Sequence, residues 1–403
     1  MSELKTASHR RRSIDGQFDE RLRVIAPAKY REIRSLSTDG PLSVQGAGLS
    51  YAAAGFRAES TAVDMRRFNR ILEYNPETLT IRVEAGTPIG SLHRFLTERE
   101  FHLSPIPGHP SITVGGCIAG NVHGKNPCQD GTFSDHVLGL SLFHPRHGLL
   151  KISQTQSSDL FDLTCGGLGL TGIIVDATLR LRRLPGQTML TTNVPFDHLE
   201  RGGVALGKAS KEFDMAYGWC DLAADGDLMG RGFLTLGKFS KDTAKRRRQE
   251  VQVKAPPRGR WPPLYGRRSV AILNRVLIRW NFPQEQRVQS LDDALFPVAK
   301  NTNYFRGYGK RGFIEHQILI PRDAWTDFSN ELIRLIREQQ PCIGIAILKC
   351  FSGQSKLLRF GGEGISLALH LSADSSQQGF SESLDELTIS RGAIANPIKD
   401  SRL

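Results

Sequence analysis

Short apolar runs separated by polar turns divide the first half of the chain into strand-like and helix-like segments. The segments STAVDM (60–65) and LTIRVEAG (79–86) are typical of strands, and GIIVDATLRLRRL (172–184) begins as a buried strand. In the second part of that last segment, apolar residues alternate with charged ones, as they do in a strand with one exposed face. From about 20 to 184 the pattern therefore predicts short strands alternating with helices.

The segment TPIGSLHRFLTERE (87–100) is the helix that the pattern predicts best in this half. Thr87 is placed to be its N-cap, and Pro88 stands in the first turn, where a missing N–H costs nothing. Its apolar side chains share one helical face: Ile89, Leu92, Phe95 and Leu96.

The composition changes after Pro185, with fewer glycines and more aromatic residues. The segments 312–320 and 365–373 are strand-like, and 324–339 is an amphipathic helix. We therefore place a domain boundary near 185. Four parts are expected: an N-terminal tail (1–20), a first domain (21–185), a second domain (186–390) and a C-terminal segment (391–403).

Composition places the chain among ordinary globular proteins, because 39% of its 403 residues are hydrophobic and 23% are charged. No N-terminal apolar stretch resembles a secretory signal, and no run of about 18 apolar residues could cross a membrane. The six cysteines are scattered without metal-binding spacing. We expect a reduced, cytoplasmic protein with no metal site.

The segment 241–268 carries ten lysines and arginines against two acids, within a net charge of +12 for the whole chain. Its four prolines predict a loop. A solvated insertion is one interpretation, and contact with anionic lipid headgroups is another. Nucleic-acid binding is not expected, because no binding motif accompanies the charge. The next segment, VAILNRVLIRW (270–280), fits either a packed helix or a helix lying on a membrane surface.

Three glycine-rich segments are typical of loops that contact a ligand: 44–55, 106–126 and 165–174. Glycine lets backbone N–H groups approach a ligand closely, and successive N–H groups form concavities that suit phosphate. Three such loops in one half of the chain indicate a long ligand with a diphosphate. The G-x-G-x-x-G pattern of Gly167, Gly169 and Gly172 is followed by a strand and not by a helix, which excludes a Rossmann site.

Five motifs carry a resemblance to a known family: GAGLSYAAAG, VEAGTPIGSLHRFL, PGHPSITVGGCIAGNVHGKN, GTFSDHVLGLSL and CGGLGLTGIIVDATLRL. Their order and spacing resemble the vanillyl-alcohol-oxidase-type (PCMH-type) FAD-binding family. VHGKN and the final KDSRL are similar to the branch that oxidises decaprenylphosphoryl-β-D-ribose at its 2′-hydroxyl. The resemblance implies an α+β fold, with a two-subdomain FAD-binding domain and an α+β substrate domain built on an antiparallel sheet.

The resemblance also implies which residues contact FAD. The segment 113–126 would wrap the diphosphate, with His123 and Asn126 near the isoalloxazine ring, and Gly172 and Ile173 would close the adenine side. The full set of expected FAD contacts is Gly46, Ala47, Gly48, Leu49, Ser50, Tyr51, Gly108, Thr113, Gly115, Gly116, Gly120, Asn121, His123, Gly124, Asn126, Gly131, Gly172 and Ile173.

One departure from the family bears on how FAD is held. Many relatives carry, at the position of Leu49, a histidine that bonds covalently to the flavin. A leucine cannot form that bond, so we expect non-covalent FAD. Attachment through His123 is the alternative.

Two lysines are the catalytic candidates. Lys399 and Lys349 match family lysines beside the flavin and substrate, and a buried lysine can serve as a base or as a fixed positive charge. We expect the substrate hydroxyl to lose its proton to or through Lys399. The expected substrate contacts are Tyr51, Trp219, Tyr308 and Gln317.

The resemblance thus implies an FAD-dependent oxidoreductase that oxidises a sugar CH–OH group. The favoured reaction oxidises the 2′-hydroxyl of polyprenylphosphoryl-β-D-ribose to a keto sugar, and a short-chain reductase partner would complete the epimerisation. Two alternatives stay open. One is an aldonolactone-type sugar oxidase. The other is a non-catalytic flavin-binding subunit of a cell-envelope glycolipid complex, because family members continue beyond the position of Leu403. A lipid-linked substrate would also bring the protein to the inner face of the membrane.

Overall fold

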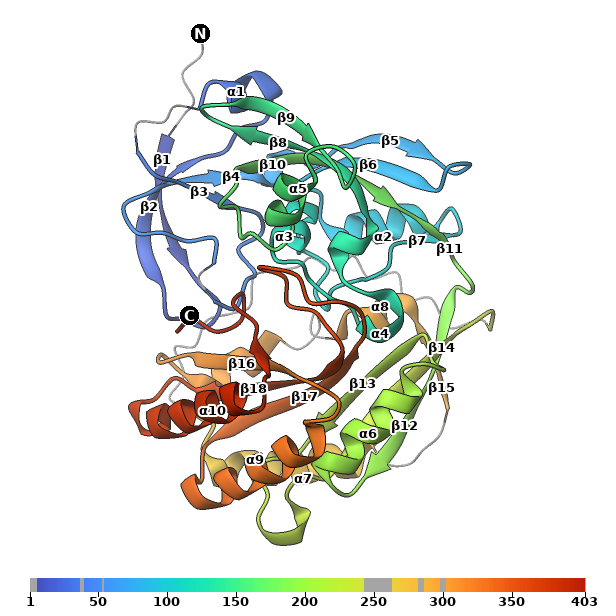
Figure 1. Cartoon of the computed structure of the whole chain (residues 1–403), viewed down its shortest axis with the longest axis vertical. Coiled ribbons are helices and arrows are strands. Elements are labelled where there is room, and N and C mark those ends of the chain that lie inside the picture. Colours follow the sequence, from blue (N-terminus) through green and yellow to red (C-terminus); the bar gives the residue numbers. More distant parts are fainter. Residues whose placement is uncertain are drawn as a thin grey trace.

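The structure is a computed structural model that describes residues 6–36, 40–52, 54–242, 263–281, 286–297 and 302–402. Figure 1 shows the elements of the N-terminal half above those of the C-terminal half, and the last residues return to the junction between them. The fold is α+β, as the sequence predicts.

Two larger sheets build the N-terminal half, beside the pair of short strands β7 (Phe101–His102) and β11 (Arg182–Arg183). The four-stranded sheet has the order β1 (Thr6–Arg12), β2 (Asp19–Ile25), β4 (Thr61–Asp64), β3 (Leu42–Gln45). The five-stranded antiparallel sheet has the order β5 (Ile71–Asn75), β6 (Thr80–Glu84), β10 (Ile173–Arg180), β8 (Val137–His144), β9 (Gly148–Ile152). The helical elements are α1 (Tyr30–Arg34), η1 (Met65–Arg67), α2 (Ile89–Thr97), α3 (Val114–Ala119), α4 (Pro127–Asp130), η2 (Phe133–His136) and α5 (Ser158–Thr164).

The expected N-terminal tail differs from the structure, because residues 6–12 form β1 and pair with β2. The strand TASHRRR is exposed and lacks the apolar alternation that marks a half-buried strand. Backbone pairing and ion pairs hold it instead, among them Arg10 with Asp19 and Arg11 with Asp64.

The predicted helix 87–100 is present, but it begins later than the sequence indicates. Its N-cap is Pro88 and its first residue is Ile89. Thr87 makes no capping bond, and its buried hydroxyl has no hydrogen-bond partner among the residues that the structure describes. The N–H groups of Ile89 and Gly90 donate instead to the carbonyls of Ile112 and Pro110, so a neighbouring loop satisfies this end of the helix.

One eight-stranded antiparallel sheet organises the C-terminal half. Its order is β15 (Arg287–Ser290), β12 (Thr188–Phe196), β14 (Gly232–Ser240), β13 (Met215–Cys220), β17 (Ile343–Phe351), β18 (Gly364–Ser372), β16 (Phe313–Ile320), β19 (Ile394–Ala395). The helical elements are α6 (Leu199–Ala209), η3 (Gly226–Leu228), α7 (Arg267–Asn281), α8 (Leu291–Leu295), η5 (Thr302–Tyr308), α9 (Trp325–Gln339), η6 (Ser375–Gln377) and α10 (Gln378–Ser390). Most of the expected basic loop 241–268 lies outside the described residues.

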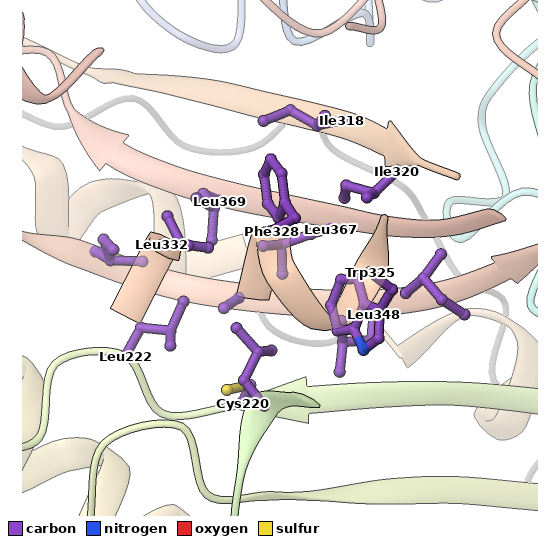
Figure 2. Packing of buried hydrophobic residues seen from close by; sticks show 14 of the residues in the cluster. Cys220, Leu222, Ile318, Ile320, Trp325, Phe328, Leu332, Leu348, Leu367 and Leu369 are labelled. Atoms are coloured by element: carbon purple, nitrogen blue, oxygen red, sulfur yellow. The ribbon is translucent and has the colours of Figure 1, made fainter. Parts of the chain in front are cut away.

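The largest core lies between this sheet and the helices α6, α9 and α10. The amphipathic pattern of α9 directs Trp325, Phe328 and Leu332 into it, and all three are buried. Figure 2 shows these side chains beside Leu348 and Leu367 of the sheet. Burying an aromatic side chain of this size stabilises the fold by about 2–3 kcal/mol.

The other face of the sheet points toward the N-terminal half. Alternation along β17 places Leu348 and Cys350 in the core and Lys349 on the opposite face. The short strand β19 pairs with the edge strand β16, and residues 396–402 follow directly. A strand of the sheet and the end of the chain therefore bring Lys349 and Lys399 to the junction of the two halves.

Candidate active site

A cleft of about 170 Å³ lies at this junction, on the side of the N-terminal half. The loop 44–51 forms one wall, α3 and its flanking residues form another, and the C-terminal segment contributes Ile398 and Lys399. Nine of the expected FAD contacts line it: Gly46, Ala47, Gly48, Leu49, Ser50, Tyr51, Thr113, Gly116 and Gly120.

The cleft requires glycine at Gly46 because its walls approach closely there. A Cβ at Gly46 would lie 2.1 Å from Thr113 Oγ1. That oxygen accepts a hydrogen bond from the backbone N–H of Gly116 (3.3 Å) and thereby caps α3. Gly48 has a φ of +67°, which favours glycine.

These residues fit a flavin nucleotide. The cleft is walled by glycine-rich backbone, the surface that suits a diphosphate. Gln45 also lines it, and the Nε2 of this buried side chain lacks a partner among the described residues, so it can donate to a bound ligand.

Other expected FAD contacts lie outside this cleft. Gly115 packs on Ala85, and Gly124 packs on Pro105 and Ile106. The remaining ones are distributed as follows: Gly108 lies near Lys125, Asn121 accepts from the N–H of Ser134, Gly131 ends α4, and Gly172 and Ile173 stand at the start of β10.

Asn126 makes a contact that the sequence does not reveal. Its Nδ2 donates to the carbonyls of Ser210 (2.9 Å) and Phe213 (2.6 Å), so the side chain joins the two halves of the chain. Its expected contact with the isoalloxazine ring stays a prediction. A single motif cannot reveal such a contact, because its partners lie more than 80 residues away.

His123, Lys349 and Gln317 form a hydrogen-bonded cluster across the junction. Gln317 Nε2 lies 3.0 Å from His123 Nε2, and Lys349 Nζ lies 3.1 Å from His123 Nδ1 and 2.9 Å from the carbonyl of Gly124. An amide nitrogen can only donate, so His123 Nε2 accepts and the proton of the neutral ring is assigned to Nδ1. Nδ1 lies within reach of two acceptors: the Gly124 carbonyl oxygen at 3.3 Å and, when the lysine amine is neutral, Lys349 Nζ at 3.1 Å.

The electrostatics agree with that assignment. Burial, together with the charges of Lys125 and Lys399, holds the pKa of Lys349 well below its ordinary value. Burial is the largest cause that likewise holds the pKa of His123 well below its ordinary value. Both shifts favour the uncharged forms of these neighbouring basic groups, and an uncharged Lys349 amine can accept a proton.

Lys399 has different surroundings. Its Nζ lies 3.4 Å from Glu315 Oε1 and 3.9 Å from the centroid of the Tyr51 ring. A carboxylate and an aromatic face both favour an ammonium group. The structure thus brings together two lysines with different surroundings at the same junction: Lys349, whose pKa is lowered, and Lys399, which is paired with a carboxylate.

Two expected substrate contacts have other surroundings. Tyr308 is buried and packs tightly against Gly344, and its expected contact with the substrate stays a prediction. Trp219 stacks on Phe233 and lines a second groove of about 380 Å³ between the sheet and α7.

Sequence reasoning missed Glu315, His370, Lys125 and Asn396. Asn396 Nδ2 donates to Gln317 Oε1 (2.8 Å) and so orients the amide that faces His123. Glu315 carried a usable signal, since alternation in the strand 312–320 places a charged residue on the same face as Phe313 and Gln317.

Comparison with known proteins supports this interpretation of the cleft. Residues 24–153 match the FAD binding domain family. The decaprenylphosphoryl-beta-D-ribose oxidase of Mycolicibacterium smegmatis is 24% identical over 370 residues, which cover 89% of this chain and 80% of that protein. Two other relatives match shorter stretches. L-gulonolactone oxidase of Mus musculus is 26% identical over 41% of this chain and 38% of its own length. D-2-hydroxyglutarate dehydrogenase of Xanthomonas citri is 27% identical over 46% of this chain and 40% of its own length.

The match confirms the predicted resemblance. The chain carries a PCMH-type FAD-binding domain, FAD is its cofactor, and the chain is an FAD-dependent oxidoreductase.

Proposed function

We propose that this FAD-dependent oxidoreductase oxidises a secondary hydroxyl of a lipid-linked sugar, and that the 2′-hydroxyl of polyprenylphosphoryl-β-D-ribose is that hydroxyl. The product would be the 2′-keto sugar, which a short-chain reductase partner would reduce to complete an epimerisation. The observation that carries this proposal is the hydrogen-bonded pair of Lys349 and His123, which follows Val122 of the glycine-lined cleft wall. The extent of the match to decaprenylphosphoryl-beta-D-ribose oxidase supports the substrate class.

FAD, held by the residues that line the cleft, would supply the two-electron acceptor. Lys349 Nζ would take the proton of the substrate hydroxyl, because its lowered pKa favours the neutral amine and because His123 and the Gly124 carbonyl fix its position. The Lys399 ammonium, held against Tyr51, would supply a fixed positive charge at the cleft wall. From the sequence alone, Lys399 was expected to take the proton. We assign the proton to Lys349 instead, because the ion pair with Glu315 favours the ammonium form of Lys399.

The second groove offers room for the rest of a lipid-linked sugar. It runs along the same face of the sheet as Lys349 and is lined by Trp219 and Phe233 together with Thr191, Asn193 and Thr235. Aromatic faces with neighbouring hydroxyl and amide groups suit a sugar, and the apolar Ile345 and Ile347 suit a prenyl chain.

A substrate assay tests the proposal. Anaerobic addition of polyprenylphosphoryl-β-D-ribose to the FAD-loaded protein should bleach the visible flavin absorbance, whereas the 2′-deoxy analogue should not. Bleaching by an aldonolactone instead would favour the sugar-lactone oxidase. Absence of bleaching with every sugar would favour the non-catalytic flavin-binding subunit. Because Leu49 stands where a covalent histidine would be, acid precipitation should release the flavin into the supernatant.

The helix α7 supports contact with an anionic membrane surface. Ile272 and Trp280 are 65% and 77% exposed, and Val276 between them is exposed as well, so one strip of the helix is apolar. The spacing of Arg275 and Arg279 places them on the neighbouring strip, and the helix contains no acidic residue. Its opposite side is anchored by Val270 and Asn274.

None of the helices in the described parts of the chain is long and apolar enough to cross a bilayer. We therefore propose a cytoplasmic protein that contacts the inner face of the membrane peripherally.

Vesicle binding tests this surface. The wild-type protein should sediment with phosphatidylglycerol vesicles. The bound fraction of the I272S/W280S variant should be at least fivefold lower than that of the wild type, because the apolar strip is removed. The matched control is Ile389→Ser, which removes an equally exposed residue of α10. Two results would contradict the proposal: an equal loss of vesicle binding in both variants, or equally strong binding of the wild type to vesicles made only of phosphatidylcholine.

A further inference from the structure

A buried carboxylate lies behind Lys399. Glu315 is 3% exposed and stands on β16, directly opposite His370 of β18 in the register of the sheet. Cross-strand neighbours of this kind interact directly. Neither residue lines the cleft.

The two carboxylate oxygens of Glu315 have different partners. Oε2 lies 2.7 Å from His370 Nε2, and Oε1 lies 3.4 Å from Lys399 Nζ. His370 is held in turn, since its Nδ1 lies 3.0 Å from the hydroxyl of Tyr304 and its ring stacks on Phe313 at 5.0 Å. Tyr304 and Phe313 therefore hold the His370 ring, and His370 fixes the carboxylate oxygen that does not face Lys399.

The charge of this carboxylate also depends on its two neighbours. Burial alone would raise the pKa of Glu315, but the charges and hydrogen bonds of Lys399 and His370 outweigh burial and hold the pKa at about 2. Glu315 is thus an anion inside the protein, and a buried anion is stable only with its partners in place.

Lys399 needs such a support because of its place in the chain. It follows the two-residue strand β19, and its long side chain has several freely rotating bonds. The Glu315 ion pair and the Tyr51 ring are the contacts that the structure gives to its ammonium group.

We propose that Glu315 is a positioning residue of the oxidation: its carboxylate, fixed by His370, holds the Lys399 ammonium against Tyr51 at the wall of the cleft. The value of this position for the reaction rests on the function proposed above. The position itself can be tested without substrate or cofactor.

The first test follows Lys399 in the protein without FAD. Reductive methylation with ¹³C-formaldehyde labels the lysine amines, and the Lys399 signal, identified by its loss in Lys399→Met, should be shifted upfield by the Tyr51 ring. Glu315→Gln should return that signal to the position of exposed lysines, as Tyr51→Leu should. Glu84→Gln is the matched control, because it removes another buried glutamate paired with a cation, Arg70, in the other half of the chain. It should leave the signal unchanged. An unshifted wild-type signal, or a signal that stays shifted in Glu315→Gln, would overturn the proposal.

The second test is a double-mutant cycle on the FAD-loaded protein. Glu315→Gln should slow flavin reduction by the sugar about 10- to 100-fold, the scale expected for a misplaced group, with a smaller change in substrate affinity. In the Lys399→Met background the same change should cost less than about twofold, because there is no ammonium left to position. Glu315→Asp should keep more of the rate than Glu315→Gln. Equal costs in the two backgrounds would assign Glu315 a structural role only.

The two tests separate the failures. If the labelled lysine behaves as expected but no sugar reduces the flavin, the proposed function fails and the positioning of Lys399 stands. If the sugar reduces the flavin but the labelled lysine does not respond to Glu315, the positioning fails and the function stands.

Discussion

Replacing Lys349 with methionine should slow substrate oxidation by about 10²- to 10⁴-fold, the range that a general base contributes. Methionine keeps the length and most of the volume of the side chain but removes the amine that lies 3.1 Å from His123 Nδ1. FAD affinity should stay within about threefold of wild type, because Lys349 lies outside the residues that line the cleft. Stopped-flow reduction of the flavin by the lipid-linked sugar measures the rate, and an FAD titration measures the affinity.

The pH dependence identifies which group accepts the proton. The pKa of Lys349 lies well below its ordinary value, and the neutral amine that acts as the base becomes protonated as the pH falls. The rate should therefore decrease on the acid side, and this limb should be absent in Lys349→Met. Lys125→Met removes one of the charges that lower this pKa, so the acid limb should move to higher pH.

The control for Lys349→Met is Lys238→Met, an exposed lysine of the same sheet whose amine lies over the ring of Phe213. That change should leave both the rate and its pH profile intact. An acid limb that persists in Lys349→Met would contradict the assignment and return the proton to Lys399.

The elements that carry the site follow from periodicity in the sequence. The strand-like segment 312–320 is β16 within one residue, and the amphipathic segment 324–339 is α9 within one residue. Local pattern sufficed here because each element buries a continuous apolar face against its neighbours. The glycines that line the cleft could also be predicted, since close approach of backbone leaves few other residue types.

The cluster behind the cleft could not be predicted in the same way. Glu315 meets His370 because β16 pairs with β18, and it meets Lys399 because β19 adds to the same edge. The register of distant strands sets both contacts, and register is a property of the whole sheet. The same reason explains why the packing of Tyr308 against Gly344 in the interior could not be predicted.

Gly46→Ala should raise the dissociation constant of FAD at least tenfold. The backbone at Gly46 has no positive φ, so the effect would come from contact and not from strain in the chain. The new Cβ would lie 2.1 Å from Thr113 Oγ1 and 3.3 Å from Thr113 Cβ, which forces the threonine side chain to move. That movement breaks the cap of α3, worth about 1 kcal/mol, and shifts two walls of the cleft at once. Quenching of flavin fluorescence during titration of the FAD-free protein measures the effect.

Two comparisons separate this contact from a general loss of stability. Thr113→Ala removes the cap but also removes the oxygen that the new Cβ would strike, so Gly46→Ala should cost less FAD affinity in that background than in the wild type. Gly379→Ala places the same methyl group in α10, where the nearest atom is 3.9 Å away, and should leave FAD binding unchanged. Of the two glycine substitutions, only Gly46→Ala touches the cleft. Equal FAD affinity in the wild type, Gly46→Ala and Gly379→Ala would therefore show that the close approach of Gly46 and Thr113 does not shape the flavin site.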